Sequence, residues 1–276
     1  RTTSSIGYSI VFDSLNNRIR PSAGQRFTLS QDVAGLGGGV KYLRTRADAK
    51  KYWGLGDSGF IFSLGAEGGY IMGLGQDIRL TDRFFLGEPQ IRGFGIRGVG
   101  PRIVRRYIDT VNGGYLDDSS GRTDDALGGK AYYLGRAELE IPLGSGAREM
   151  GLRPSIFADA GALWGGKRPT DASNPTTTVR PIKTSTGLFQ CSDNTSGAIS
   201  TSAVSTCPTG STLLANTIPP FDEIYSGNSA KPRLSVGIGI SWNSPFGPFR
   251  IDLAKALLKE PGDNTKLFSF NIGTQF

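Results

Sequence analysis

The 276-residue chain contains no histidine and only two cysteines. The absence of histidine excludes Ser-His-Asp catalysis. Cys191 and Cys207 have no further cysteine near either of them, so neither zinc nor any other metal site is predicted. The 15 residues between them are rich in Ser, Thr, Gly and Asn. We predict a disulfide that closes a surface loop, which implies an oxidising compartment; two unpaired thiols are the alternative.

Long apolar runs are also missing. No run of 18 apolar residues is present, so no transmembrane helix is expected, and no segment of helical length keeps a 3.6-residue apolar period. A membrane β-barrel is still compatible with this composition, because a barrel strand needs only every second residue to be apolar. The chain opens with Arg1-Thr-Thr-Ser-Ser instead of an apolar signal segment. We therefore expect a processed chain or a fragment of a longer one.

Positive charge and glycine are plentiful. The net charge is +7, from 31 basic and 24 acidic residues, and 40 residues are glycine. A basic chain can indicate nucleic-acid binding. Here the basic residues are scattered, many alternate with apolar positions, and no recognition motif is found. No nucleic-acid partner is predicted.

Nine segments alternate between apolar and polar residues and are bounded by turn residues, which predicts nine β-strands. They are 4–12, 25–33, 40–52, 60–70, 130–141, 154–164, 233–242, 249–256 and 267–276. Two long connections interrupt them, at about 74–129 and about 165–231, and the second holds both cysteines. We expect an all-β chain with a single domain over residues 1–276.

The alternation separates an apolar face from a polar, charged face in each strand. One face meeting lipid and the other a wet lumen is typical of a transmembrane antiparallel β-barrel. A soluble β-sandwich is the competing interpretation, and it would have to bury Arg136, Glu138, Glu140 and Asp159 or expose nine apolar stripes. Strand lengths near ten residues and aromatic residues at strand ends also favour the barrel. Single-chain bacterial barrels have even strand counts, so nine strands look like the second half of a larger one.

The first long connection carries the sequence Ile91-Arg92-Gly93-Phe94. Taken alone, Arg-Gly-Phe in a glycine-rich loop is ordinary turn chemistry. If the loop folds into the lumen, however, Arg92 can pair with Glu140 and Asp159, which both point inward by parity. A guanidinium is well suited to bidentate contact with a carboxylate.

Six motifs occur in an order that resembles the BamA family of outer-membrane protein assembly factors, over essentially the whole chain. They are the Ile91–Phe94 loop motif, the Asp-Asp-Ala-Leu-Gly-Gly run at 124–129, the strand acid Glu140, the run 157–161 with Phe157 and Asp159, the Ser-Pro-Phe-Gly-Pro turn at 244–248, and the closing strand with Phe268, Phe270, Gly273 and Phe276. The resemblance implies the C-terminal half of a 16-strand type barrel, without the first half and the periplasmic POTRA domains. It departs from the family in having Ile91 for valine and a longer second connection.

The resemblance also implies roles for these residues. The sixth extracellular loop enters the barrel, and Arg92 contacts Phe157, Asp159 and the inward acid Glu140. The terminal strand forms one side of a lateral seam at which client strands pair by β-augmentation. The implied location is the bacterial outer membrane. The implied partners are outer-membrane lipids, unfolded client β-barrel proteins and lipoprotein subunits of the BAM complex, reached through the POTRA domains. No cofactor and no enzymatic activity are implied.

Other functions remain as alternatives. A two-partner secretion transporter or a TamA-like translocation barrel shares the loop arginine motif. A passive porin would have an open lumen. A barrel enzyme could use paired carboxylates such as Glu138 and Glu140 for glycoside hydrolysis, but Arg136 and Arg92 offer those carboxylates ordinary ion pairing.

Overall fold

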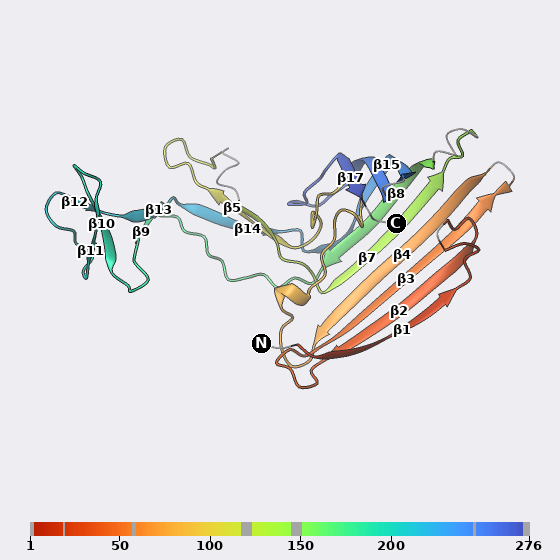
Figure 1. Cartoon of the computed structure of the whole chain (residues 1–276), viewed down its shortest axis with the longest axis horizontal. Coiled ribbons are helices and arrows are strands. Elements are labelled where there is room, and N and C mark those ends of the chain that lie inside the picture. The colour runs from red at the N-terminus through yellow and green to blue at the C-terminus, as the bar shows by residue number, and fades with distance from the viewer. Residues whose placement is uncertain are drawn as a thin grey trace. The chain divides into compact units, whose positions relative to one another are not determined.

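Nine antiparallel strands form one continuous sheet in the computed structural model, which describes residues 3–18, 20–56, 59–116, 123–144, 151–244 and 247–272 (Figure 1). The strands are β1 (Ser5–Asp13), β2 (Gly24–Ala34), β3 (Tyr42–Leu55), β4 (Phe60–Gly73), β7 (Ala131–Glu140), β8 (Leu152–Trp164), β15 (Ser229–Ser244), β16 (Gly247–Leu258) and β17 (Phe268–Ile272). They pair in the order β1-β2-β3-β4-β7-β8-β15-β16-β17. Among the described residues β1 and β17 do not pair with each other, so the sheet is open there and forms part of a barrel wall.

The nine strands predicted from the sequence are confirmed, with differences at their ends. β15 begins at Ser229, before the predicted start. The sequence pattern did not reveal this start because a register shift between Ser229 and Arg233 breaks the period of two. Within the described residues, β17 covers only Phe268 to Ile272. Gly273 and Phe276, predicted as part of this strand, lie outside the described residues, as do residues 245 and 246 of the predicted turn.

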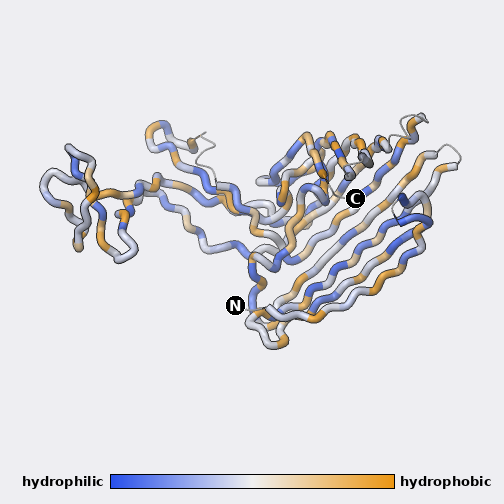
Figure 2. The backbone as a smooth tube through the Cα atoms, in the orientation of Figure 1, coloured by the Kyte–Doolittle hydropathy of each residue, from blue (hydrophilic) through white to orange (hydrophobic). Residues whose placement is uncertain are grey.

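Side chains on the two faces of this wall differ in polarity. Hydrophilic and hydrophobic positions alternate along its strands (Figure 2). One face exposes large apolar side chains, including Ile238 on β15 at 57% and Phe270 on β17 at 48%. Aromatic pairs such as Trp53–Phe62 and Tyr133–Trp164 lie near strand ends on this outer face. An exposed apolar face with aromatic residues near its rims is typical of a surface that meets lipid.

Among the described residues, no helix has the length and apolar character required to cross a membrane.

The links between strands alternate between the two ends of the sheet, because successive strands run in opposite directions. The longest ones contain short strands that the sequence did not predict, since they are only three to six residues long and have no clear alternation. They are β5 (Arg102–Tyr107), β6 (Thr123–Ala126), β9 (Thr178–Pro181), β10 (Phe189–Asp193), β11 (Ile199–Ser202), β12 (Ser211–Leu213), β13 (Ala215–Ile218) and β14 (Phe221–Ser226), with a 3₁₀ turn, η2 (Leu80–Asp82). They form the small sheets β11-β10-β12, β13-β9 and β14-β5-β6.

The chain divides into two compact units. The first comprises residues 1–103, 125–168 and 225–276 and contains the nine-stranded wall; the second comprises 104–124 and 169–224. In the second unit a disulfide joins Cys191 on β10 to Cys207, as the sequence predicts. Asp193, also on β10, accepts hydrogen bonds from the backbone and hydroxyl of Ser196 and from the backbone of Thr195, which hold its pKa below the ordinary value.

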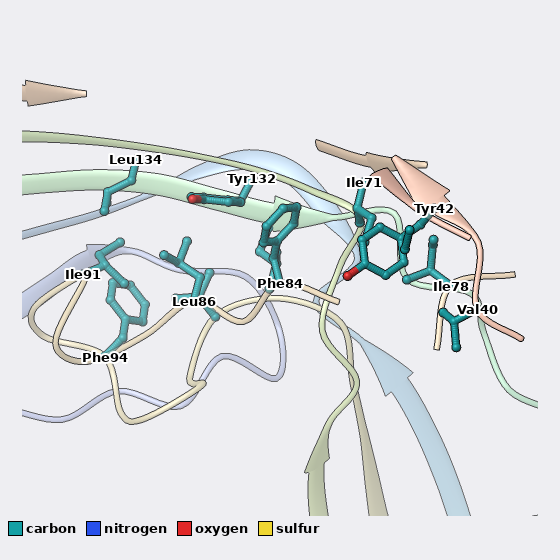
Figure 3. Close-up of a cluster of buried hydrophobic side chains, with 13 residues drawn as sticks. Val40, Tyr42, Ile71, Ile78, Phe84, Leu86, Ile91, Phe94, Tyr132 and Leu134 are labelled. Atoms are coloured by element: carbon teal, nitrogen blue, oxygen red, sulfur yellow. The ribbon is translucent and has the colours of Figure 1, made fainter. Parts of the chain in front are cut away.

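A hydrophobic core lies between the polar face of the wall and residues 74–101, hereafter the inserted loop. Leu86, Ile91 and Phe94 of this loop are almost fully buried and point towards Tyr132 and Leu134 of β7 (Figure 3). The remaining members of the cluster are Ala34, Val40, Tyr42, Ile71, Ile78, Phe84, Val99 and Leu163. The loop is thereby packed onto the wall, and we call the face that it covers the inner face.

Candidate functional site

Arg92 of the inserted loop lies buried against three residues of the wall. Its Nε donates to Asp159 Oδ2 at 2.7 Å and its Nη2 to Asp159 Oδ1 at 2.6 Å. Its own backbone N–H donates to the same Oδ2 at 3.0 Å. Its Nη1 donates to Glu138 Oε2 at 2.9 Å, and the guanidinium lies 3.4 Å from the centre of the Phe157 ring. This combines a bidentate ion pair with a cation–π contact.

Strand register brings these partners together. On the inner face, Glu138 of β7 is opposite Phe157 of β8, and Arg136 is opposite Asp159. On β15, Gly237 lies opposite Phe157 of β8, and a Cβ at Gly237 would be 2.6 Å from the phenylalanine ring. The absence of a side chain at this position therefore leaves room for the Phe157 ring under Arg92.

Gly93 is required by the close approach of the loop to the wall. Its φ is +84°, a region that favours glycine. A Cβ at this position would be 3.0 Å from Ser235 Cβ on β15 and 3.3 Å from Ala254 Cβ on β16. The glycine of the motif thus lets the backbone after Arg92 lie directly on two strands.

The structure corrects the expected carboxylate partners of Arg92. Asp159 contacts it as predicted, whereas the second acid is Glu138 and not Glu140. Glu140 instead lies 3.6 Å from Arg153 Nη1. Both acids share the inner face, but two residues along a strand amount to about 6–7 Å. Parity alone could not separate them, and the register selects the acid opposite Phe157.

Sequence reasoning missed Arg250 of β16. Its Nη2 donates to Glu138 Oε1 at 2.9 Å, and its Nε lies 2.9 Å from Asp252 Oδ1. Glu138 therefore accepts from two arginines, one on the inserted loop and one on the wall. Ser155 Oγ adds a third hydrogen bond to this carboxylate, at 2.6 Å. The alternation of polar residues on the 249–256 strand, which places Arg250 and Asp252 on one face, was the available signal.

We call the group of Arg92, Glu138, Phe157, Asp159 and Arg250 the latch cluster. Its charged atoms are matched in ion pairs and hydrogen bonds that tie loop, β7, β8 and β16 together. Such pairs fix geometry more than they add stability, because both partners lose hydration. In the described part of the chain, no group of three or more His, Cys, Asp and Glu residues is placed to hold a metal ion.

The terminal strand presents its apolar side chains outward. Phe268 and Phe270 are about half exposed on the outer face, at 52% and 48%, and Phe249 stacks on Phe270 at 6.0 Å. Ser269, on the opposite side, is buried. β17 pairs with β16 on one side and forms an edge of the nine-stranded sheet on the other. An edge of this kind is a template for pairing with another strand.

Comparison with known proteins assigns the family. The Omp85 superfamily domain matches residues 1–276, so the chain belongs to the Omp85 superfamily. The apolar outer face and the polar inner face agree with this assignment. The chain is part of a bacterial outer-membrane β-barrel.

Similar proteins fall in two groups. The chain is 29% identical over 274 residues to the outer membrane protein assembly factor BamA of Neorickettsia risticii (strain Illinois). This alignment covers 99% of this chain and 27% of that protein. It is 25% identical to BamA of Neisseria meningitidis serogroup B, over 93% of this chain and 26% of that protein. It is 32% identical to the sorting and assembly machinery component 50 homolog of Mus musculus, over 58% of this chain and 31% of that protein. The chain thus spans between a quarter and a third of the length of these curated relatives.

A solved structure shows the same fold. The crystal structure of BamA from Haemophilus ducreyi lacking POTRA domains 1-3 aligns with a TM-score of 0.64. It covers 96% of this chain and 41% of that chain, at 21% sequence identity. At this identity the likeness establishes the barrel architecture alone.

Proposed function

We propose that the protein containing this chain is an assembly factor that folds and inserts client β-barrel proteins into the outer membrane. The relatives named for outer-membrane protein assembly and for sorting and assembly support this function. The structural observation that carries it is the terminal strand β17, for which the described residues supply one sheet partner, β16. We propose that an incoming strand pairs with the other side of β17 by β-augmentation, which makes this side a lateral seam.

The proposed partners follow from this chemistry. Unfolded client β-barrel proteins supply the pairing strands, and outer-membrane lipids contact the apolar outer face. Lipoprotein subunits of a BAM complex would attach through POTRA domains of the full-length protein. We also propose that the protein acts without covalent chemistry, because strand pairing and lipid contact require no bond to be made or broken.

The inserted loop supports an assembly factor over a passive porin. A porin keeps a water-filled lumen. Here the loop packs Ile91 and Phe94 into a hydrophobic core on the inner face, and Arg92 fixes it to two strands, β7 and β8. In this part of the barrel wall the inner face is covered by protein.

The test is insertion of a separate, urea-unfolded barrel protein into liposomes that contain the full-length protein. Folding is followed as a gel shift of unheated samples, with empty liposomes as the control. We expect faster folding with the protein present. No acceleration, together with passage of a soluble partner across the bilayer, would assign the protein to the two-partner secretion or TamA-like relatives instead.

A further inference from the structure

The connection between β16 and β17, residues 259–267, does not extend the terminal strand. We call it the terminal loop. β17 pairs with β16 from Ile272 opposite Phe249 to Phe268 opposite Leu253. β16 itself continues to Leu258. The terminal loop therefore leaves the edge of β16 before that strand has ended.

The terminal loop pairs instead with the inserted loop, immediately after Arg92. Gly95 N–H donates to the Asn264 carbonyl and Asn264 N–H to the Gly98 carbonyl, each at 2.8 Å. Lys266 N–H donates to the Gly93 carbonyl at 3.1 Å. Phe94 and Thr265 form an antiparallel bridge between these bonds. The motif that carries Arg92 is thus hydrogen-bonded to the segment that leads into the terminal strand.

Two ion pairs hold the terminal loop in this position. Arg233 of β15 and Asp263 are both fully buried, with Nε 2.9 Å from Oδ2. The other donors of Arg233 reach the carbonyls of Gly227, Ser229 and Lys231 and the second oxygen of Asp263. Lys266 Nζ lies 2.7 Å from Glu88 on the inserted loop.

Residues 264–266 lie against the inserted loop, and pairing with β16 stops at Leu267, whose carbonyl accepts from the Ala254 N–H at 2.9 Å. If β17 continued in the same register, Thr265 would lie opposite Ala256. Thr265 is instead bridged to Phe94 of the inserted loop. The anchors at Asp263 and Lys266 favour pairing with the inserted loop.

We propose that the terminal loop is a positioning element that sets where β17 begins, and therefore how much of the terminal edge can pair with a client strand. Arg233 and Asp263 are its positioning residues. Movement of the inserted loop would release residues 264–266, which can then pair with β16 beyond Ala254 and lengthen the edge. The consequence for client strands rests on the proposed function, whereas the coupling of the two loops does not.

Hydrogen exchange of the full-length protein in liposomes tests the coupling. Asp263→Asn removes the charge but keeps an acceptor for the Glu260 N–H, which donates to Asp263 at 2.7 Å. We expect peptides covering 93–98 and 259–267 to exchange about a hundredfold faster, because one partner of a buried ion pair is lost. Lys231→Ala is the matched control, since it removes only the exposed Lys231–Glu260 contact to the same loop; its exchange should equal that of wild type.

Insertion kinetics test the consequence. Asp263→Asn should change the rate of client insertion by about threefold or more, the usual size of a coupling effect. Gly95→Cys with Asn264→Cys should restore the wild-type rate once oxidised, because a Cβ at Gly95 would be 3.4 Å from Asn264 Cγ. Wild-type protein under the same oxidant and reductant controls for the Cys191–Cys207 disulfide.

The outcomes separate the two proposals. Unchanged exchange in both Asp263→Asn and Lys266→Ala overturns the coupling of the loops. Faster exchange with an unchanged insertion rate, or a change that the cross-link does not reverse, overturns the positioning role. If Asp263→Asn does not fold, Lys266→Ala carries the same measurements. Wild-type protein that fails to accelerate insertion refutes the proposed function, while exchange still decides the coupling.

Discussion

At the scale of single residues, Arg92 makes more contacts with the wall than its sequence motif alone could predict. A guanidinium offers five N–H donors in a fixed plane, which suits one bidentate carboxylate and a second acid at its side. Asp159 takes the bidentate position, Glu138 the other, and Phe157 covers one face of the guanidinium. An ammonium group cannot reproduce this set of contacts.

Replacing Arg92 with alanine should detach the inserted loop. The change leaves Asp159 buried without its partner, a loss of about 3–5 kcal/mol. We expect faster proteolysis within residues 74–101 and impaired assembly or lower levels of the full-length protein. Arg97→Ala is the matched control, because Arg97 is exposed in the same loop and contacts the Phe85 ring. Normal growth and normal outer-membrane protein content of the Arg92 variant would contradict its role in function.

Gly93→Ala tests the close approach of loop and wall. Alanine there adds both the strain of a positive φ, about 1–2 kcal/mol, and a contact with Ser235. Gly113→Ala provides the reference, since its φ is +77° and a Cβ would meet nothing within 4 Å. In thermal melts followed by the loss of gel mobility shift, the Gly93 variant should be the less stable of the two. Equal losses would mean that the contact with the wall is unimportant.

At the scale of elements, alternation was sufficient to predict the nine wall strands but could not predict the contacts of the loops. A strand repeats every two residues, so its apolar face is visible in the sequence. Loop residues such as Asn264 have no such period, and their pairing with Gly95 depends on a fold that joins positions far apart. The choice of Glu138 over Glu140 likewise depends on register, and alternation treats these two acids as equivalent.

The register can be tested with these two acids. Glu138→Gln should destabilise the protein by about 1–3 kcal/mol, because charged hydrogen bonds to Arg92 and Arg250 are weakened. Glu140→Gln should change stability by no more than about 0.5 kcal/mol, since its contact with Arg153 is long and partly exposed. Urea unfolding in detergent or lipid compares the two variants directly. A larger effect of Glu140→Gln would show that the sequence-based assignment was right.

The disulfide between Cys191 and Cys207 belongs to the element scale as well. It closes a loop of about 15 residues, for which chain entropy alone corresponds to about 3 kcal/mol. Mass spectrometry under non-reducing, denaturing conditions should find these two residues joined, and reduction should speed proteolysis within 169–224. Two free thiols in freshly isolated protein would refute the pairing.

At the scale of the whole molecule, the two faces of the wall suit different surroundings, lipid on the outer side and a polar lumen on the inner side. Its outer face exposes apolar side chains and its inner face carries charged residues and the inserted loop. Composition alone does not reveal this, because the polar half of each strand lowers the mean hydropathy to that of a soluble protein. The arrangement becomes visible only when each strand is read by alternate positions.

A positive charge should therefore destabilise the protein when it is placed on the outer face and be tolerated on the inner face. Ile238→Lys puts a cation on the outer face near the middle of β15 and should cost about 2–4 kcal/mol. Thr28→Lys puts the same cation on the inner face of β2, directly opposite Asp48 of β3, and should be nearly neutral. Folding yields into liposomes measure both. Equal tolerance of the two substitutions would show that the outer face does not meet lipid.

The latch cluster also has a consequence for the order in which the protein itself folds. Arg92 must wait for Glu138 and Asp159, which follow it by 46 and 67 positions, and Glu138 is joined by Arg250 a further 112 positions on. Contacts between such distant positions form late, because long stretches of chain must first be ordered. We therefore expect Arg92 to bind its partners only after β8 has joined the wall, so that a buried Arg92 marks a sheet formed at least as far as β8.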